Sequence, residues 1–229
     1  GVQPHNVFMY DSKGLIHAGR TDLDDMKKTF AAHPKDVDFE QAFIGADVFL
    51  GLSKAGLVSK EMIASMAKDP IVFALANPEP EISYKEATSV RKDIIMATGR
   101  SDHPNQVNNV LGFPYIFRGA LDVRATSINE EMKLAAVKAI ASLAKETIPE
   151  EVIEAYGGKN ISFGREQIIP KPLDPRLIYY VAPAVARAAM ESGVAQEPIE
   201  NWEEYENQLK SRLGLDNKLQ RNITSKAQG

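Results

Sequence analysis

The segment PIVFALANP, residues 70–78, decides the fold of this chain, because a continuous apolar run leads directly into the polar dipeptide Asn77-Pro78. An apolar run without alternation is typical of a strand that is covered on both faces of a parallel sheet. Further runs of this kind are NVFMYD (6–11), ADVFLGLS (46–53) and DIIMATG (93–99). We therefore predict a parallel sheet built from these segments.

Helical patterns separate the predicted strands. Residues 21–30 carry apolar side chains at helical spacing after an acidic start. Ser59 is placed to cap a helix that ends before Pro70. Ser83 stands three residues before Glu86, which is the pattern of a capping box. The alternation of strands and helices predicts an α/β fold with crossover helices.

The second half of the chain is helical in character. A helix is expected over residues 127–146, opened by a capping box of Ser127 and Glu130. Its apolar stripe comprises Ile128, Met132, Ala136, Ile140 and Leu143. The connection over residues 155–173 is rich in Gly and Pro and is expected to be a loop with at most one short strand.

A further helix is expected after this loop. Asp174 is placed as its N-cap and Pro175 as its first residue, with a kink at Pro183 and an end near Gly193. Its apolar stripe of Ile178, Val181, Val185 and Ala189 indicates core packing.

Bulk properties exclude several classes of function. The chain has 229 residues, a formal net charge of −4 and no cysteine. The negative net charge gives no electrostatic indication of nucleic-acid binding. The absence of cysteine excludes disulfides and fits a cytoplasmic protein. No apolar run is long enough to span a membrane. Because the sequence starts with Gly1, we expect a processed start or a piece of a longer protein.

The composition changes after residue 198. Residues 199–229 begin with an acidic, amphipathic segment and end in a polar tail. The apolar face of this segment comprises Trp202, Tyr205, Leu209 and Leu213. A single helix cannot bury such a face, so it must pack on another domain, a partner subunit or the body of this fold. We therefore divide the chain into residues 1–198 and a C-terminal helix or linker, 199–229.

Asp11 ends the first predicted strand. In a dinucleotide-binding sheet, the second strand ends in an acidic residue that meets the adenosine ribose. An ordinary Asp-Ser-Lys-Gly turn explains the same residues equally well. The glycine fingerprint G-x-G-x-x-G, which precedes such an aspartate by about twenty residues, is absent from the sequence. Ser12 and Lys13 could accept a 2′-phosphate and favour NADP over NAD, although Asp11 would repel that phosphate.

Residues 14–21, GLIHAGRT, nearly form a P-loop, with Arg20 in the place of the lysine. A P-loop needs small, Gly-rich residues whose N–H groups can surround phosphates. Leu15, Ile16 and His17 instead predict a strand or a hairpin, and we exclude a P-loop.

Two separated asparagine sites complete the candidate chemistry. Asn77 follows a predicted strand at the sheet edge where ligands of open α/β folds bind, although an Asn-Pro turn explains it more simply. Asn108 is expected to cap a helix, with Asn109 in the first turn. We predict that Asn77 and Asn109 meet over one ligand, which neutral amides can orient by hydrogen bonds.

Four segments resemble the cofactor-binding domain of bacterial malic enzymes. They are VFALANPEPEI, ATGRSDHPNQVNNVLGFPYIFRGALD, ATSINEEMKLAAVKAIASLA and IIPKPLDPRLIYYVAPAVARAAMESGVA. The resemblance covers residues 6–198. It implies a Rossmann-like, doubly wound and mostly parallel sheet that lacks its first β-α unit and is followed by helical segments. The tail from residue 199 is similar to the stretch that leads into a phosphotransacetylase-like domain in long bacterial forms.

The family oxidatively decarboxylates L-malate to pyruvate with NADP⁺ or NAD⁺ and Mg²⁺ or Mn²⁺, and the resemblance implies a site for these ligands. Asn77 and Asn109 match asparagines that contact cofactor and malate, and Asn108 is a weaker neighbour. The segment Asp11 to Lys13, which includes Ser12, matches the adenosine-ribose and 2′-phosphate region, and Ser53 matches a loop near the cofactor.

The resemblance places the family's tyrosine acid, lysine base, acidic metal ligands and glycine fingerprint upstream, so no catalytic or metal-ligating residue is expected here. We expect the segment to be inactive alone and to act with that upstream part in a homo-oligomer. Two alternatives remain: a non-catalytic scaffold for oligomerisation or regulation, and another dinucleotide-dependent dehydrogenase.

Overall fold

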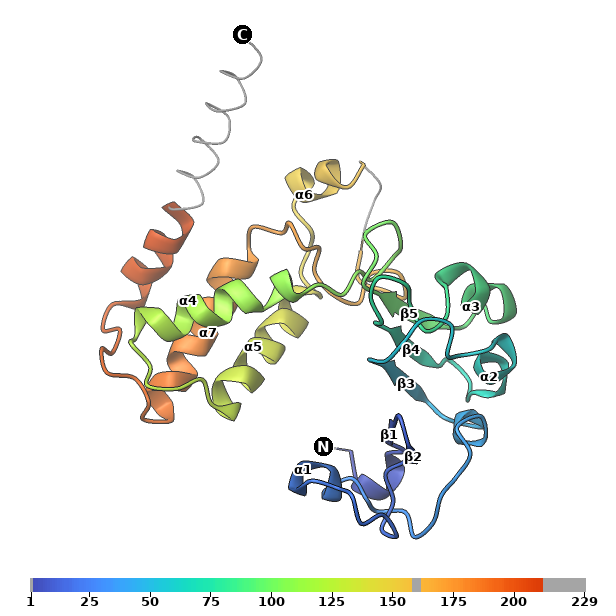
Figure 1. Ribbon diagram of the computed structural model, residues 1–229. Coiled ribbons are helices and arrows are strands. Elements are labelled where there is room, and N and C mark those ends of the chain that lie inside the picture. The colour runs from blue at the N-terminus through green and yellow to red at the C-terminus, as the bar shows by residue number, and fades with distance from the viewer. Residues whose placement is uncertain (1, 158–161, 212–229) are drawn as a thin grey trace. The chain divides into compact units, whose positions relative to one another are not determined.

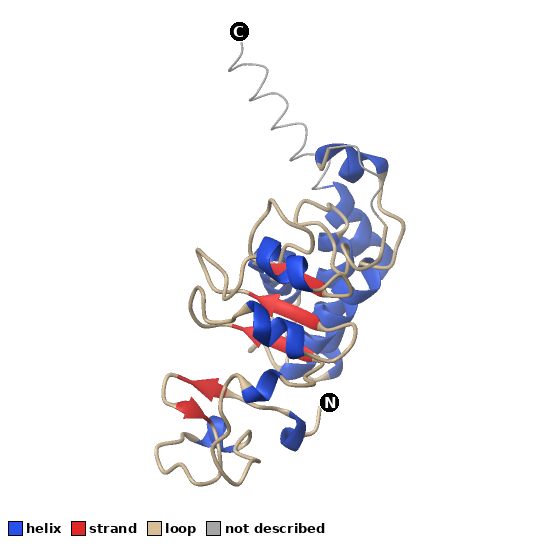
Figure 2. Ribbon diagram, turned by 90° about the vertical axis from the view of Figure 1, so that its right-hand side faces the viewer, coloured by secondary structure: helices blue, strands red, loops and turns tan. Residues whose placement is uncertain are grey.

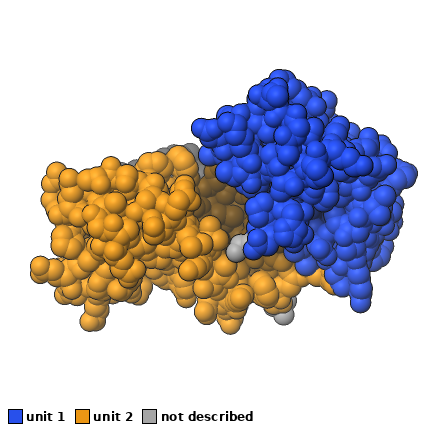
Figure 3. All heavy atoms as spheres, turned by 90° about the horizontal axis from the view of Figure 1, so that it is seen from below, with its two compact units in different colours: residues 1–99 blue, residues 100–229 orange. Residues whose placement is uncertain are grey.

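The computed structural model describes residues 2–157 and 162–211. Contacts between residues divide the chain into two compact units, residues 1–99 and 100–229, which Figure 3 shows in different colours. Each unit has a hydrophobic core of its own.

A three-stranded parallel sheet forms the centre of unit 1 (Figure 1). Its strands are β3 (Val48–Gly51), β4 (Ile71–Ala74) and β5 (Ile95–Thr98), which lie in the order β3-β4-β5. The register pairs Val48 with Ile71 and Ile71 with Ile95. These strands lie within three of the predicted segments and confirm the parallel α/β fold.

Two helices cover one face of this sheet, as Figures 1 and 2 show. They are α2 (Lys60–Ser65) and α3 (Tyr84–Val90), and their side chains share one core with Val72 and Met96 of the strands. Both start as predicted. The Ser59 hydroxyl oxygen accepts the Met62 N–H at 3.2 Å, and Ser83 and Glu86 form a reciprocal capping box.

The prediction that residues 6–11 form a strand of the parallel sheet is wrong. The chain instead forms an antiparallel hairpin of β1 (Tyr10–Asp11) and β2 (Gly14–Leu15). Gly14 adopts a positive φ of 110°, which a residue with a side chain rarely adopts, so the chain reverses directly after Asp11. The hairpin predicted from Leu15 and Ile16 is confirmed in part, because β2 ends at Leu15.

Short elements flank the hairpin. The 3₁₀ helix η1 (Pro4–Asn6) precedes it, and α1 (Asp25–Lys28) and η2 (Gln41–Phe43) lie between the hairpin and the sheet. A series of aromatic contacts connects the two regions. The Tyr10 and Phe39 ring centroids are 5.0 Å apart, and Phe43 contacts both Phe39 and Phe49 of β3. The hairpin is thus anchored to the core of unit 1.

Unit 2 is a helical bundle. Its helices are α4 (Phe113–Asp122), α5 (Glu130–Leu143), α6 (Glu150–Ala155) and α7 (Leu177–Glu191), and α7 packs against both α4 and α5. Both predicted stripes are confirmed. Met132, Ala136 and Leu143 of α5 share a core with Val181 and Val185 of α7, and all five are nearly or completely buried.

The predicted start of α5 is wrong by two residues. Its cap is Asn129, whose side-chain oxygen accepts the Met132 N–H at 3.0 Å, whereas Ser127 is exposed outside the helix. Asparagine is as good an N-cap as serine, and Asn129 directly precedes the first helical residue. The capping box of Ser127 and Glu130 is therefore absent.

The start of α7 also differs from the prediction. Pro175 and Arg176 form a turn before the helix, and an Asp174 carboxylate oxygen accepts the Arg176 N–H at 2.9 Å. Asp174 therefore caps this turn rather than the helix. The helix continues through Pro183, and Gly193, with φ 75°, follows its C-cap as predicted.

Residues 202–211 are helical and pack on α7. Tyr205 and Leu209 are buried there beside Ala182, and the Arg187 guanidinium lies 3.6 Å from the Trp202 ring centroid. The body of the fold thus covers this part of the amphipathic face, while Leu213 lies outside the described residues. Within residues 2–157 and 162–211, no helix has the length and apolar character needed to cross a membrane.

Candidate cofactor-binding site

The carboxyl edge of the sheet in unit 1 brings two predicted site residues to neighbouring strands. Gly51, the last residue of β3, pairs with Ala74, the last residue of β4. Ser53 and Asn77 follow these strand ends, and both are exposed. In open α/β folds, ligands bind at this edge. The chain therefore offers a backbone loop and a side-chain amide at the place where the fold binds ligands.

Glu81 holds this edge together, although no motif in the sequence predicts it as a site residue. Its side chain is completely buried, and its two carboxylate oxygens accept the Ser53 N–H at 2.9 Å and the Ala76 N–H at 3.0 Å. A Cβ atom at Gly51 would lie only 2.4 Å from the Glu81 carboxyl carbon. In the segment PEPEI, Glu79 is exposed and Glu81 buried, and no sequence rule distinguishes them.

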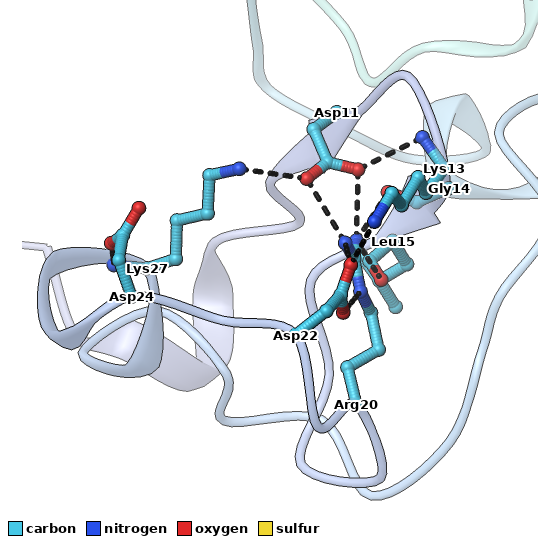
Figure 4. Close-up of polar contacts among 8 residues, drawn as sticks. All are labelled: Asp11, Lys13, Gly14, Leu15, Arg20, Asp22, Asp24 and Lys27. Carbon is cyan, nitrogen blue, oxygen red and sulfur yellow. Dashed lines mark hydrogen bonds and ion pairs between the residues drawn. The ribbon is translucent and has the colours of Figure 1, made fainter.

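Asp11 lies in a cluster of charged side chains in the hairpin of unit 1 (Figure 4). Its carboxylate accepts hydrogen bonds from the Arg20 guanidinium at 2.8 and 3.1 Å and from the Lys27 ammonium at 2.9 Å. Arg20, followed by Lys27, holds the pKa of Asp11 well below its ordinary value. The Lys13 ammonium lies 2.6 Å from Asp22, which also pairs with Arg20.

The cluster changes the electrostatics expected from the sequence. Two cations, Arg20 and Lys27, neutralise the Asp11 carboxylate, so its repulsion of a nearby phosphate is weaker than for an isolated aspartate. Ser12 and Lys13 are both exposed beside it. Arg20 and Lys27 were not predicted as site residues. Their positions, nine and sixteen residues after Asp11, follow no helical or strand period.

Asn108 and Asn109 open a single helical turn in unit 2. The turn is η3 (Asn109–Leu111), and the Asn108 side-chain oxygen accepts the Val110 N–H at 3.0 Å. This confirms that Asn108 is a cap and that Asn109 stands in the first turn. The longer helix, α4, starts only at Phe113. Asn77 belongs to unit 1, so its meeting with Asn109 over one ligand stays a prediction.

Metal ligands are a separate question. The described part of the chain contains no group of three or more His, Asp or Glu side chains placed to hold a metal ion. Mg²⁺ and Mn²⁺ are bound in proteins mainly by oxygen ligands, carboxylates above all. The described residues therefore do not fit a metal centre of their own.

A parallel sheet with polar loops at its carboxyl edge is the architecture of Rossmann-type domains and of other open α/β folds that bind ligands there. Residues 3–154 match the family described as "Malic enzyme, NAD binding domain". This chain belongs to the malic enzyme family.

Relatives and a solved structure agree with this family. The chain is 53% identical over 229 residues, 99% of its length, to an NADP-dependent malic enzyme of Haemophilus influenzae. It is 50% identical over 210 residues, 91% of its length, to an NAD-dependent malic enzyme of Rhizobium meliloti. It spans only 30% and 27% of these relatives. The crystal structure of Entamoeba histolytica malic enzyme superposes with a TM-score of 0.85 at 34% identity, over 99% of this chain and 46% of that one.

Proposed function

We propose that this chain is the cofactor-binding part of a malic enzyme, which oxidatively decarboxylates L-malate to pyruvate and CO₂ with reduction of NADP⁺ or NAD⁺. The observation that carries the proposal is the arrangement of Ser53 and Asn77 after adjacent parallel strands at the sheet edge. Family membership supports the same reaction. The divalent metal ligands, the acid and the base are expected upstream of this segment.

The proposed contribution of this chain is orientation. When bound, the nicotinamide supplies the acceptor for the hydride that leaves malate C2. The amides of Asn77 and Asn109 hold cofactor and malate by neutral hydrogen bonds, and Asn108 fixes the turn that presents Asn109. The Ser53 loop lines the cofactor from the end of β3. None of these side chains adds charge at the place where hydride moves.

At the other end of the cofactor, the hairpin is proposed to meet the adenosine ribose. The Asp11 carboxylate accepts a ribose hydroxyl, and Ser12 with Lys13 receives a 2′-phosphate. Arg20 and Lys27 support this role because they offset the negative charge of Asp11. We therefore propose a preference for NADP⁺.

A Lys13→Ala variant should lower the ratio of NADP⁺ to NAD⁺ turnover, with Lys92→Ala, an exposed lysine of unit 1, as control. An unchanged ratio would count against the 2′-phosphate site.

The central experiment assays the chain alone and mixed with the upstream segment of a related malic enzyme. Malate-dependent NADPH formation only in the mixture supports the proposal. Asn77→Ala and Asn109→Ala should each lower that turnover at least about fivefold, since a lost orienting hydrogen bond costs about 1–3 kcal/mol. If Asn109→Ala leaves turnover untouched, the site assignment is wrong. If the chain binds the upstream segment but the mixture stays inactive, a non-catalytic scaffold role is the better explanation.

Assembly and location complete the proposal. We propose that the enzyme is a cytoplasmic homo-oligomer and that residues 199–229 lead toward a phosphotransacetylase-like domain. Size-exclusion chromatography with light scattering on the mixture tests the first point. A monomeric active mixture would contradict it.

A further inference from the structure

A buried carboxylate ties together the loops that follow β3 and β4. Glu81 accepts the Ser53 N–H through one oxygen and the Ala76 N–H through the other. Backbone bonds reinforce the connection, because the Val58 N–H donates to the Glu81 carbonyl oxygen at 3.0 Å and the Gly56 N–H to that of Pro80 at 3.2 Å. Residues 52–58 and 75–81 are thus joined at several points.

The chemistry of this connection is specific to a carboxylate. An ionised carboxylate accepts through both oxygens, and here each oxygen meets one backbone donor. A glutamine of equal size would turn an NH₂ group toward one of these donors and leave it unsatisfied. The Glu81 carboxyl group also requires a glycine at position 51, since a side chain there would occupy the position of this carboxyl.

The two residues that Glu81 fixes adjoin the proposed cofactor contacts. Ser53 itself stands in the loop assigned to the cofactor, and Ala76 directly precedes Asn77. Glu81 is completely buried, so it does not reach the ligand surface itself. A displacement of either loop would therefore change how the ligand is held without removing any contacting side chain.

We propose that Glu81 is a positioning residue, whose carboxylate sets the spacing between the Ser53 loop and Asn77 and thereby the affinity for the dinucleotide. The inference rests on the proposed cofactor role of this sheet edge and adds a residue that acts through Ser53 and Ala76.

The first test compares Glu81→Gln with Glu86→Gln in the chain mixed with the upstream segment. The control makes the same chemical change in the cap of α3, away from the two loops. NADP⁺ binding, measured by calorimetry, should weaken about tenfold for Glu81→Gln and less than twofold for Glu86→Gln. The KM for NADP⁺ should rise in parallel, while the KM for malate changes less. Native circular dichroism in both variants excludes general unfolding.

The second test uses the close approach of Gly51. Gly51→Ala should weaken NADP⁺ binding in the presence of Glu81, because the new methyl group displaces the carboxyl. In a Glu81→Ala background the same methyl group has room, so its additional effect should be small. The two changes are therefore expected to be non-additive. Additive effects would overturn a direct link between the two residues.

Hydrogen exchange gives a readout that needs no ligand. In Glu81→Gln, the Ser53 or the Ala76 amide should exchange at least tenfold faster, while amides inside α3 remain protected. Should Glu81→Gln fail to fold, Gly51→Ala carries the same two measurements. Unchanged exchange and unchanged NADP⁺ affinity in a folded variant would overturn the positioning role and leave the proposed function standing. If the unaltered mixture does not bind NADP⁺, the proposed function fails, and the inference with it.

Discussion

At the scale of single residues, the charged cluster around Asp11 links the proposed coenzyme site to acid stability. Arg20 contacts both Asp11 and Asp22, and its side chain is only 10% exposed. The pKa values of both aspartates lie below the ordinary 3.8, with Arg20 as the largest cause in each case. A lowered pKa in the folded state means that ionised Asp11 stabilises unit 1.

The free energy of unfolding of unit 1 should therefore fall as the pH drops below about 4. Above the unfolded pKa the stabilisation is complete, and it is lost as the pH falls toward the folded pKa of each aspartate. Arg20→Gln should flatten this dependence, because the folded pKa values then move back toward 3.8. Urea unfolding at a series of pH values measures the slope. Lys92→Gln, which changes an exposed lysine bonded to a backbone carbonyl, should leave it unchanged.

The contacts of Asp11 also show what a sequence reveals about a site. A strand end followed by Asp-Ser-Lys-Gly was visible, and the turn at Gly14 was one of the two interpretations. The partners Arg20 and Lys27 were not, since they reach Asp11 from a loop and from α1 at spacings that no regular element fixes. Glu81 was missed for a related reason, because its burial depends on two backbone donors, one in its own loop at Ala76 and one in the distant loop at Ser53.

At the scale of elements, helix starts were predicted well where one cap was available and poorly where several polar residues competed. Ser59 and Ser83 stand alone before their helices and cap them. Before α5, Ser127 and Asn129 are both good capping residues, and the sequence does not show where helical geometry begins. The side-chain amide of Asn129 also donates to the Ser192 hydroxyl at 2.8 Å, a tertiary contact that favours this choice.

Replacing Asn129 should therefore destabilise unit 2 more than replacing Ser127. Asn129→Ala should lower the free energy of unfolding of unit 2 by about 1 kcal/mol or more, because the Met132 N–H loses its acceptor. Ser127→Ala, at the exposed position first expected to be the cap, should change it by less than about 0.5 kcal/mol. Urea titrations of both variants decide the matter, and equal effects would mean that Asn129 is not the cap.

The crossing of α4 and α7 leaves no room for a side chain at Gly119. A Cβ atom there would lie 2.3 Å from the Ala182 carbonyl oxygen and 2.9 Å from the Val185 Cβ atom. Backbone cannot yield as a flexible side chain does, so Gly119→Ala should destabilise unit 2 by about 2 kcal/mol or more. Gly112→Ala is the matched control, since its Cβ would meet only ordinary contacts at 3.5 Å or more. If Gly119→Ala does not lower the midpoint temperature of thermal unfolding, this packing is contradicted.

At the scale of the whole chain, the parallel sheet, the helical second half and the two long apolar stripes followed from the sequence. The runs around Val72 and Met96 are apolar because both strands are buried, and such patterns depend on the segment itself. The sequence did not predict the division into two units after Gly99 or the burial of Tyr205 and Leu209 against α7. Both depend on contacts between segments that are distant in the sequence. Whether residues beyond 211 lead to a further domain stays a prediction.

The helix at residues 202–211 should contribute to the stability of unit 2. Leu209 is 1% exposed in a cluster with Ala182 and Tyr205, so Leu209→Ala should lower the free energy of unfolding by about 3 kcal/mol. Gln208→Ala, on the exposed side of the same helix, should have little effect. Differential scanning calorimetry of both variants provides the comparison. Equal transition temperatures for Leu209→Ala and the unaltered chain would show that this helix is detached in solution.

The central place of α7 in unit 2 has a consequence for biosynthesis. The helices α4 and α5 and residues 202–211 all bury their apolar sides against it, yet two of these segments are translated well before it. While the ribosome has not yet released residue 191, α4 and α5 lack their shared partner surface, whereas residues 1–99 are already complete. Unit 1 should therefore become ordered before α4 and α5 do, and a protease added to stalled nascent chains should spare unit 1 while it still cleaves within α4.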